Sequence, residues 1–369
     1  MIAAGGTGGH VYPAVAAAEA LRQQHRGVEL IFVGSAGGFE QPLLEEANFR
    51  FDQVAAVRAG PLHGVNPLRA VFSLANLAIG TVQALRLLRR FAPRAVLLTG
   101  GWVGLPVAWA AWLRRVPSLI YLPDIEPGLA IRTLQRYAAR VAVTAADSAQ
   151  FFPPGRIVVT GYPVRAALRA AASGGDREAA LGHFGLDPAR KTLLVFGGSR
   201  GARSINHALI AIVPELLADG VQVLHLTGTL DWETIAAQRT AMAGADGYHV
   251  FPYLHEEMAL ALAAADLAVC RAGASTLGEL PLFGLPAVLV PYPHAWRYQK
   301  VNADWLAQQG AGVVLEDAAL TTDLLPLLRA LLGDSARLAA MRERSAALAQ
   351  PRGAANLADE LLRLAGENV

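Results

Sequence analysis

The chain has 369 residues, of which 53% are hydrophobic and 17% are charged, and its formal net charge is +2. This composition supports a large buried core and excludes an intrinsically disordered chain. The length fits two α/β domains of ordinary size. A single cysteine, Cys270, excludes a disulfide scaffold and a cysteine-cluster metal site, and it is typical of a reducing compartment.

Three charge-free apolar runs cover residues 70–85, 95–113 and 280–296. A membrane-spanning helix needs roughly 20 consecutive apolar residues. The first run is too short and the other two are interrupted by glycine or proline, so we expect none of them to span a membrane. We also expect no secretory signal, because no charged segment followed by an apolar segment begins the sequence.

β-Branched apolar runs alternate with helical patterns along the chain, which predicts strands buried on both faces and joined by helical crossovers. In the first half the predicted strands are residues 1–4, 30–33, 95–98, 118–121, 141–144 and 157–160. In the second half they are residues 192–196, 222–226, 249–251, 267–270, 287–290 and 312–315. The predicted fold class is α/β, with two doubly wound parallel-sheet domains.

The seam between the two halves is predicted near residues 161–169, which follow the last strand of the first half and precede a stretch of small residues at 170–176. The predicted domains are residues 1–163 and 164–345. Residues 346–369 form a third predicted segment, with helical apolar spacing at 354–364.

Charge is distributed unevenly along the chain. Residues 1–160 contain 15 of the 32 Lys and Arg residues and 9 of the 30 Asp and Glu residues, which leaves 17 against 21 for the rest. The basic excess gathers around Arg86, Arg89 and Arg90. This cluster predicts docking on an anionic membrane surface, and solvated arginines on a helix face are the alternative. Nucleic acid is not predicted as a partner, because no interleaved aromatic motif accompanies the cluster.

Three glycine-rich turns, Gly5–His10, Gly197–Arg203 and Arg271–Thr276, each follow a predicted strand. Glycines there permit positive φ angles and let backbone N–H groups approach a phosphate at a helix N-terminus. Turns at the carboxyl ends of strands in two domains predict a ligand cleft. A dinucleotide site is disfavoured, because Gly34 stands where the ribose-binding carboxylate belongs. Tight turns without a ligand are the alternative.

Polar side chains near these turns are candidates for ligand binding. Glu279 lies one helical turn beyond Thr276, where a carboxylate suits the hydroxyls of a ribose. Gln299 and Asn302 share a helix face and offer amides to sugar hydroxyls. For each of these residues, a position on a helix surface is the alternative.

His10 is the first candidate for a general base, because it can transfer a proton near neutral pH. Asp124 is the second candidate, with Glu126 close to it in sequence. A helix-capping role is the alternative for His10. The sequence contains no HExxH or DxD motif and no His/Cys cluster, so no catalytic metal is expected.

A series of motifs resembles, in order and spacing, the signatures of the MurG family of N-acetylglucosaminyltransferases. These motifs are Gly5–His10 (GGTGGH), Gly100–Pro106 (GGWVGLP), Thr160–Arg165 (TGYPVR), Gly197–Ala202 (GGSRGA), Arg271–Glu279 (RAGASTLGE) and Pro291–Ala303 (PYPHAWRYQKVNA). The resemblance implies a GT-B fold, with UDP-N-acetylglucosamine in the second domain and a lipid-linked muramoyl-peptide acceptor in the first. It also implies that the final helix crosses back to the first domain.

The implied reaction is an inverting transfer of N-acetylglucosamine to the muramoyl 4-hydroxyl of lipid I, giving lipid II, on the cytoplasmic face of the membrane and without a metal or other cofactor. By motif position, the resemblance also implies roles for individual residues. Thr7, Gly8 and Gly9 would close over the donor, and the diphosphate would be contacted by Arg165 and Ser199 and lined by the turn Ala274, Ser275 and Thr276. Leu254 would meet the uracil, Glu279 would bind the ribose, and Gln299 would bind the sugar.

The stretch Tyr121–Asp124 departs from the family pattern, which has His-Glu-Gln-Asn there. Asp124 takes the amide position, Leu122 takes the Glu position, and Tyr298 replaces the first of a frequent Gln pair. These departures concern the acceptor more than the donor. The alternatives are a glycolipid synthase with another acceptor, a UDP-sugar epimerase, or a catalytically degenerate scaffold that binds nucleotide-sugar.

Overall fold

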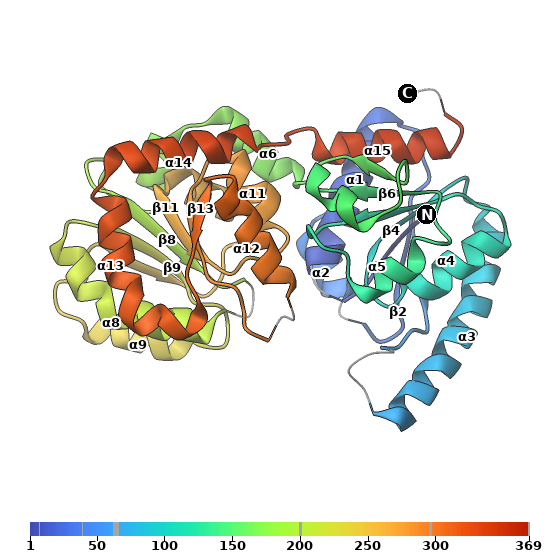
Figure 1. The fold of residues 1–369 in the computed structure, drawn as a ribbon, viewed down its shortest axis with the longest axis horizontal. Coiled ribbons are helices and arrows are strands. Elements are labelled where there is room, and N and C mark those ends of the chain that lie inside the picture. Colours follow the sequence, from blue (N-terminus) through green and yellow to red (C-terminus); the bar gives the residue numbers. More distant parts are fainter. Residues whose placement is uncertain (7, 39, 62–65, 199–200, 295–296, 368–369) are drawn as a thin grey trace. The chain divides into compact units, whose positions relative to one another are not determined.

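The computed structural model describes residues 1–369 apart from residues 7, 39, 62–65, 199–200, 295–296 and 368–369. The chain divides into two compact units (Figure 1). The N-terminal unit consists of Met1–Ala166 and Gln350–Val369, and the C-terminal unit consists of Ala167–Ala349. The N-terminal unit is therefore assembled from two separate stretches of sequence.

The N-terminal unit is organised around a seven-stranded parallel sheet with the order β3-β2-β1-β4-β5-β6-β7. Its strands are β1 (Ile2–Ala4), β2 (Ile31–Ser35), β3 (Gln53–Val57), β4 (Val96–Gly100), β5 (Ser118–Leu122), β6 (Arg140–Val143) and β7 (Ile157–Val159). Its helices are α1 (Gly8–Gln24), α2 (Glu40–Glu46), α3 (Pro67–Phe91), α4 (Gly104–Leu113), α5 (Leu129–Leu134), the 3-10 helix η1 (Ala146–Phe151) and α15 (Gly353–Leu364). The strand order reverses between β1 and β4, which is where doubly wound sheets bind ligands.

The C-terminal unit repeats this strand order in a six-stranded parallel sheet, β10-β9-β8-β11-β12-β13. Its strands are β8 (Thr192–Phe196), β9 (Gln222–Leu226), β10 (Tyr248–Phe251), β11 (Leu267–Cys270), β12 (Ala287–Leu289) and β13 (Gly312–Val314). Its helices are α7 (Arg177–His183), α8 (Arg203–Ala218), α9 (Trp232–Ala241), α10 (Met258–Ala264), α11 (Thr276–Leu282), α12 (Tyr298–Gln308), η2 (Asp317–Ala319), α13 (Leu320–Leu332) and α14 (Ser335–Ala347), and α6 (Ala166–Gly174) leads into the unit. The order reverses between β8 and β11.

Every strand predicted from the sequence is present, but the sequence analysis missed β3. This strand lies at the edge of its sheet. Four of its five residues are at least partly exposed, and Val54 is 65% exposed. A strand without a buried face lacks the continuous apolar run by which the other strands were recognised.

The C-terminal helix α15 belongs to the N-terminal unit and packs along α1. The Nδ2 atom of Asn356 donates a hydrogen bond of 3.0 Å to the carbonyl of Thr160. The buried carboxylate of Glu360 accepts one of 2.8 Å from the guanidinium of Arg140 on β6. A buried carboxylate needs such a partner, so this ion pair fixes where the helix docks.

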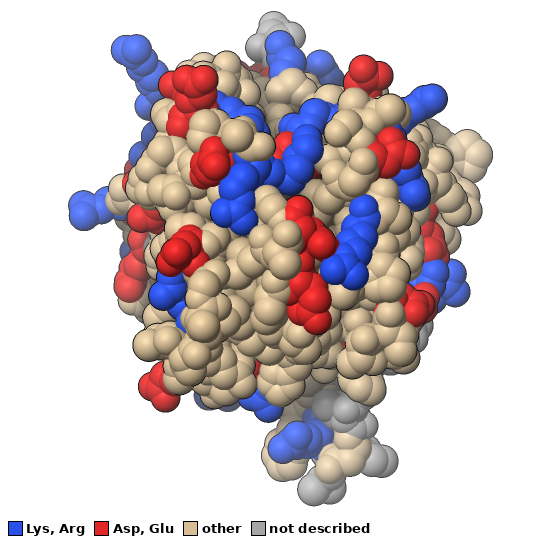
Figure 2. Space-filling model, turned by 90° about the vertical axis from the view of Figure 1, so that its left-hand side faces the viewer, with Lys and Arg blue, Asp and Glu red and all other residues tan. Residues whose placement is uncertain are grey.

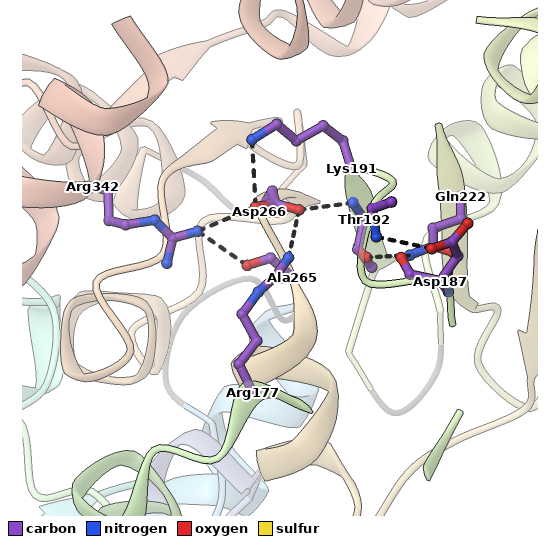
Figure 3. A network of polar contacts seen from close by, with 9 residues as sticks. Arg177, Asp187, Lys191, Thr192, Gln222, Ala265, Asp266 and Arg342 are labelled. Atoms are coloured by element: carbon purple, nitrogen blue, oxygen red, sulfur yellow. Dashed lines mark hydrogen bonds and ion pairs between the residues drawn. The ribbon is translucent and has the colours of Figure 1, made fainter. Parts of the chain in front are cut away.

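Asp266 ties together the amino-terminal edge of the C-terminal sheet. Its buried carboxylate accepts hydrogen bonds from the backbone N–H of Thr192 at 2.9 Å and from the guanidinium of Arg177 at 2.8 Å. Lys191 and Arg342 approach it to 3.8 Å (Figure 3). One carboxylate thereby connects α7, β8, β11 and α14 at the edge opposite to the glycine turns.

Charged side chains of both signs are interspersed over the face of the molecule seen in Figure 2. The described side chains in this view form no continuous basic stripe of the kind that follows a nucleic-acid backbone. A mixed surface of this kind suits solubility rather than attraction of a polyanion.

Candidate active site

A cavity of about 910 Å³ lies at the carboxyl edge of the C-terminal sheet, where the strand order reverses. Its lining includes both glycine turns of the unit: Gly197, Gly198 and Gly201 after β8, and Gly273, Ser275 and Thr276 after β11. Gln299, at the start of α12, also lines it. The structure thus brings together three residues that the sequence analysis assigned to donor binding.

The second glycine turn can adopt its conformation only with glycine. A Cβ atom on Gly201 would lie 2.1 Å from the carbonyl oxygen of Thr227, and one on Gly197 would lie 2.3 Å from the backbone nitrogen of Ala202. Gly201 also has a φ angle of +80°. The chain then enters α8, whose first N–H groups lack carbonyl partners within the helix and suit an anion. Ser199, predicted to contact the diphosphate, lies outside the described residues.

The third glycine turn is held from behind by two buried side chains. The hydroxyl of Thr276 donates a hydrogen bond of 2.6 Å to the carbonyl of Gly273. The amide of Asn302, which is fully buried, donates one of 3.1 Å to the carbonyl of Ala272. Asn302, predicted as a sugar contact, therefore supports the turn in this structure.

Gln299 and Glu279 flank this turn. The Oε1 atom of Gln299 accepts a hydrogen bond of 2.9 Å from the backbone N–H of Tyr292, and its amide nitrogen is a donor. Glu279 is half-buried in α11, three residues beyond Thr276. Ala274 lies within the turn itself, and Leu254 is buried just after β10.

Arg271 lines the cavity, yet its charge is already neutralised. Its guanidinium donates to the carboxylate of Asp317 at 2.5 Å and to the hydroxyl of Ser204 at 2.8 Å. It also donates to the carbonyls that end β12. The sequence analysis placed this arginine in a motif without a role, and the structure shows that it joins β11, α8 and η2 around the cavity wall.

The first glycine turn lies in the N-terminal unit and presents His10 at the start of α1. The Nδ1 atom of His10 is 3.0 Å from the carbonyl oxygen of Gly5. Because a carbonyl only accepts, Nδ1 carries the proton and Nε2 keeps a free lone pair. The ring packs on Gly100, where a Cβ atom would lie 2.3 Å from it. Gly8 and Gly9 form the first turn of α1, and Thr7 lies outside the described residues.

Burial lowers the pKa of His10 below its ordinary value of 6.5. The carbonyl of Gly5 and the negative charge of Asp124 oppose this shift and do not overcome it. His10 is therefore neutral at pH 7, and Nε2 is able to accept a proton. The electrostatic effect of Asp124 places the two candidate bases near one another, after β1 and β5 respectively.

A further carboxylate, that of Glu40, contacts the first glycine turn, and the sequence analysis missed it. Glu40 is buried at the start of α2, and its Oε1 atom accepts a hydrogen bond of 2.9 Å from the N–H of Gly6. No local motif marks this contact, because the two residues are joined only by folding. Glu126 is buried, and its carboxylate forms an ion pair of 2.9 Å with the guanidinium of Arg132.

Arg165 also lies in the N-terminal unit, just before the chain leaves it. Its guanidinium stacks over the ring of Tyr12, 4.6 Å from the centroid. Its buried Nε atom has no hydrogen-bond partner among the described residues. An arginine held by stacking, with donors still to be satisfied, is suited to an anionic ligand.

Comparison with known proteins identifies the chain. Residues 1–143 match the glycosyltransferase family 28 N-terminal domain, and residues 192–358 match the corresponding C-terminal domain. A relative from Desulforudis audaxviator (strain MP104C), named UDP-N-acetylglucosamine--N-acetylmuramyl-(pentapeptide) pyrophosphoryl-undecaprenol N-acetylglucosamine transferase, is 42% identical over 100% of this chain and 98% of its own length. The chain belongs to the MurG family. A relative of the same name from Roseiflexus sp. (strain RS-1) is 43% identical over 96% of this chain and 92% of its own.

Solved structures agree with this membership. The crystal structure of Acinetobacter baumannii MurG matches with a TM-score of 0.76 at 28% identity and covers 98% of both chains. A UDP-GlcNAc 2-epimerase from Neisseria meningitidis matches with a TM-score of 0.67 at 14% identity over 100% of this chain and 99% of its own, a likeness of fold alone. The family resemblance and the GT-B fold class, predicted from the sequence, are confirmed.

Among the residues that the structure describes, no group of three or more His, Cys, Asp or Glu side chains is placed to hold a metal ion. The charged groups of the C-terminal cavity are instead arginines and carboxylates that contact one another. Negative charge on a ligand there would be met by backbone N–H groups, the α8 N-terminus and arginine side chains.

Proposed function

We propose that the protein transfers N-acetylglucosamine from UDP-N-acetylglucosamine to the muramoyl 4-hydroxyl of lipid I and so makes lipid II for peptidoglycan. The observation that carries the proposal is the 910 Å³ cavity at the strand reversal of the C-terminal unit, formed by two glycine turns in a chain 42% identical to a relative named for this transfer. A cavity of this size can hold a nucleotide-sugar.

The donor would be bound chiefly by the C-terminal unit. Glycine turns that admit a ligand close to the backbone suit its diphosphate, and the Glu279 carboxylate suits the ribose hydroxyls. Gln299 would meet a hydroxyl of the sugar, and backbone groups of Leu254 would meet the uracil. The stacked guanidinium of Arg165 would add positive charge for the diphosphate.

His10 would serve as the general base. The acceptor oxygen attacks the anomeric carbon, the bond from that carbon to the diphosphate oxygen breaks, and its electron pair leaves with UDP. The acceptor proton passes to Nε2 of His10, whose lone pair is free because Nδ1 faces the carbonyl of Gly5. Attack from the face opposite to the leaving group inverts the anomeric centre. Asp124 would stabilise the imidazolium that forms.

Transfer of labelled N-acetylglucosamine to a soluble lipid I analogue tests the proposal. We expect a lipid II product that forms only when both substrates are present. An incubation with the donor alone serves as the control, because an epimerase would convert UDP-N-acetylglucosamine without an acceptor. Product from the donor alone, or binding of the donor with no transfer to a muramoyl acceptor, would contradict the proposed reaction.

The helix α3 supports docking on the cytoplasmic face of the membrane. Its exposed large apolar side chains are Val71, Phe72, Leu74, Ile79 and Val82, and Trp112 and Leu113 are exposed on the neighbouring α4. Arg86, Arg89 and Arg90 near its C-terminus are exposed as well. An apolar surface flanked by arginines suits an anionic leaflet. α3 is not a buried core helix, because only 28% of its most apolar window is buried.

By length and composition the segment Arg69–Phe91 could also cross a bilayer. However, α3 connects β3 to β4 in a single sheet and packs on α4. These connections favour a helix that lies on the membrane surface over one that crosses it. The protein would then meet its lipid acceptor as a peripheral protein on the cytoplasmic side.

Vesicle co-sedimentation tests this docking. We expect binding to vesicles that contain phosphatidylglycerol and little binding to phosphatidylcholine alone. The double change Arg89→Glu and Arg90→Glu should weaken binding at least tenfold, since each basic residue near such a surface contributes about 1 kcal/mol. The matched control is Arg337→Glu with Arg344→Glu, two exposed positions on α14. Equal binding of both double variants would contradict docking through α3.

A further inference from the structure

A chain of buried polar side chains crosses the core of the C-terminal unit and ends at the cavity. It begins at Tyr248 on β10, whose hydroxyl is 2.7 Å from Nδ1 of His225 on β9. The Nε2 atom of His225 is 3.0 Å from Oδ1 of Asn206 on α8. All three side chains are completely buried, so every one of these polar atoms has been removed from water.

The contacts of Asn206 assign every proton along this chain. Its Nδ2 atom donates to the carbonyl of Thr227 at 2.8 Å and to Oδ2 of Asp231 at 2.9 Å. Its Oδ1 atom must therefore accept from Nε2–H of His225, and Nδ1 of His225 must accept from the hydroxyl of Tyr248. Burial lowers the pKa of His225 to about 3, which keeps the ring neutral as this pattern requires.

The far end of the chain contacts the second glycine turn. The carbonyl of Thr227 packs against Gly201, where a Cβ atom would lie 2.1 Å away. The other carboxylate oxygen of Asp231 accepts a hydrogen bond of 2.9 Å from Nε of Arg203, the first residue of α8. Gly201, Arg203 and Asp231 all line the 910 Å³ cavity.

We propose that Asn206, supported by His225 and Tyr248, is a positioning residue that sets Gly201 and the first turn of α8 for the donor diphosphate. It contacts the turn and not the ligand, and it acts by holding both Thr227 and Asp231. This inference rests on the proposed function of the cavity as the nucleotide-sugar site. It adds three residues that neither the glycine motif nor the cavity lining includes.

Stability alone does not account for this arrangement. A buried polar network is worth little more than well-packed apolar residues of similar volume, because desolvation offsets its hydrogen bonds. A row of hydrogen bonds in which every donor and acceptor is paired also holds the groups at its ends in one geometry. Here those groups are the backbone of one glycine and the side chain of one arginine in the cavity wall.

The same sheet offers a matched control at its opposite edge. Gln222, also on β9 and buried, accepts from the backbone N–H of Asp187 at 3.0 Å and donates to the hydroxyl of Thr192 at 2.9 Å (Figure 3). This amide is as completely paired as that of Asn206, but it lies at the amino-terminal end of its strand, away from the glycine turns. Its loss should affect stability without affecting the cavity.

Calorimetric binding of UDP to the full chain is the test. We expect Asn206→Leu to lower both the melting temperature and the UDP affinity, the affinity by at least tenfold. Gln222→Met should lower the melting temperature by a comparable amount and leave UDP affinity within twofold. In turnover, Asn206→Leu should raise the donor KM and leave the acceptor KM unchanged, a split that general loss of stability would not produce.

Two further variants keep the test decisive if Asn206→Leu does not fold. Tyr248→Phe removes one hydroxyl and should weaken UDP binding about threefold. His225→Gln keeps one donor and one acceptor and should bind UDP more tightly than His225→Leu. Folded variants that bind UDP as the wild type does would overturn the positioning role alone. A wild-type protein that does not bind UDP would overturn the proposed donor site itself.

Discussion

The two units have the same strand order and a glycine turn at the same topological position, yet the surroundings of the two turns differ in kind. The turn after β1 lies near three titratable side chains, those of His10, Glu40 and Asp124. The turn after β8 is supported by a neutral amide chain and by arginines already paired with carboxylates. This difference suits the roles we propose, proton transfer beside the first turn and binding of an anionic donor beside the second.

The largest effect should come from the proton-transfer side. His10→Ala should lower kcat by roughly 10²- to 10⁴-fold, the usual contribution of a general base, and leave the affinity for UDP nearly unchanged. Steady-state kinetics with a lipid I analogue and calorimetry with UDP measure the two quantities. His25→Ala, an exposed histidine in the same unit, is the control. A loss of UDP affinity equal to the loss of rate would contradict the idea that His10 serves proton transfer and not donor binding.

The next largest effect concerns how the free energy of unfolding depends on pH through His225, in the C-terminal unit. Burial depresses the pKa of His225 in the folded chain to about 3, against about 6.5 when unfolded. Below pH 6.5 the unfolded chain binds a proton at His225 and the folded chain does not. The free energy of unfolding is therefore unaffected by this residue above pH 6.5 and falls as the pH is lowered from 6.5 toward 3. Between pH 7 and pH 4 the wild type should lose about 3 kcal/mol more unfolding free energy than His225→Gln, which cannot titrate. Denaturant unfolding at both pH values measures this, and parallel losses would contradict it.

Glu279→Ala should raise the donor KM about tenfold with a smaller change in kcat, because the two hydrogen bonds that the ribose hydroxyls would donate to the carboxylate would be lost. Initial rates at varied UDP-N-acetylglucosamine concentration measure the change. Glu343→Ala on the exposed face of α14 provides the comparison. Unchanged donor kinetics would remove the ribose role from Glu279.

The smallest effect should come from Glu40→Gln. The amide oxygen can still accept from the N–H of Gly6, but without the negative charge the hydrogen bond is weaker. We expect a two- to fivefold fall in kcat and no change in UDP affinity. A drop in UDP affinity would show that this carboxylate serves the donor site.

The sequence predicted the fold more completely than it predicted the site. The six strands of the C-terminal unit are found within a residue or so of their predicted bounds, because each is a short run of mainly apolar residues. The helix that follows the first glycine turn, α1, begins within that turn at Gly8 and includes Pro13. Pro13 lies beyond the N–H groups that the start of a helix leaves without partners, so it removes one backbone hydrogen bond from the interior of α1.

Within the site, local motifs revealed the glycine turns and the residues beside them. They did not reveal Glu40 or Asn206, whose partners lie on other elements and are brought to them only by folding. Spacing alone also placed Asn302 on the same face as Gln299, whereas the structure shows one side chain fully buried and the other lining the cavity. Helical spacing shows that two residues share a face of a helix, but it does not show which of them is buried by the rest of the protein.

The return of α15 to the N-terminal unit has a consequence for synthesis on the ribosome. Arg140 and Thr160 emerge long before their partners Glu360 and Asn356, so the first sheet leaves the exit tunnel without the helix that covers it. The C-terminal unit, whose sequence is continuous from Ala167 to Ala349, has all of its residues earlier. The N-terminal unit therefore receives its last helix only after the whole C-terminal unit has been synthesised, and nascent chains halted before Gln350 should expose the face of α1 that α15 covers to chaperones and proteases.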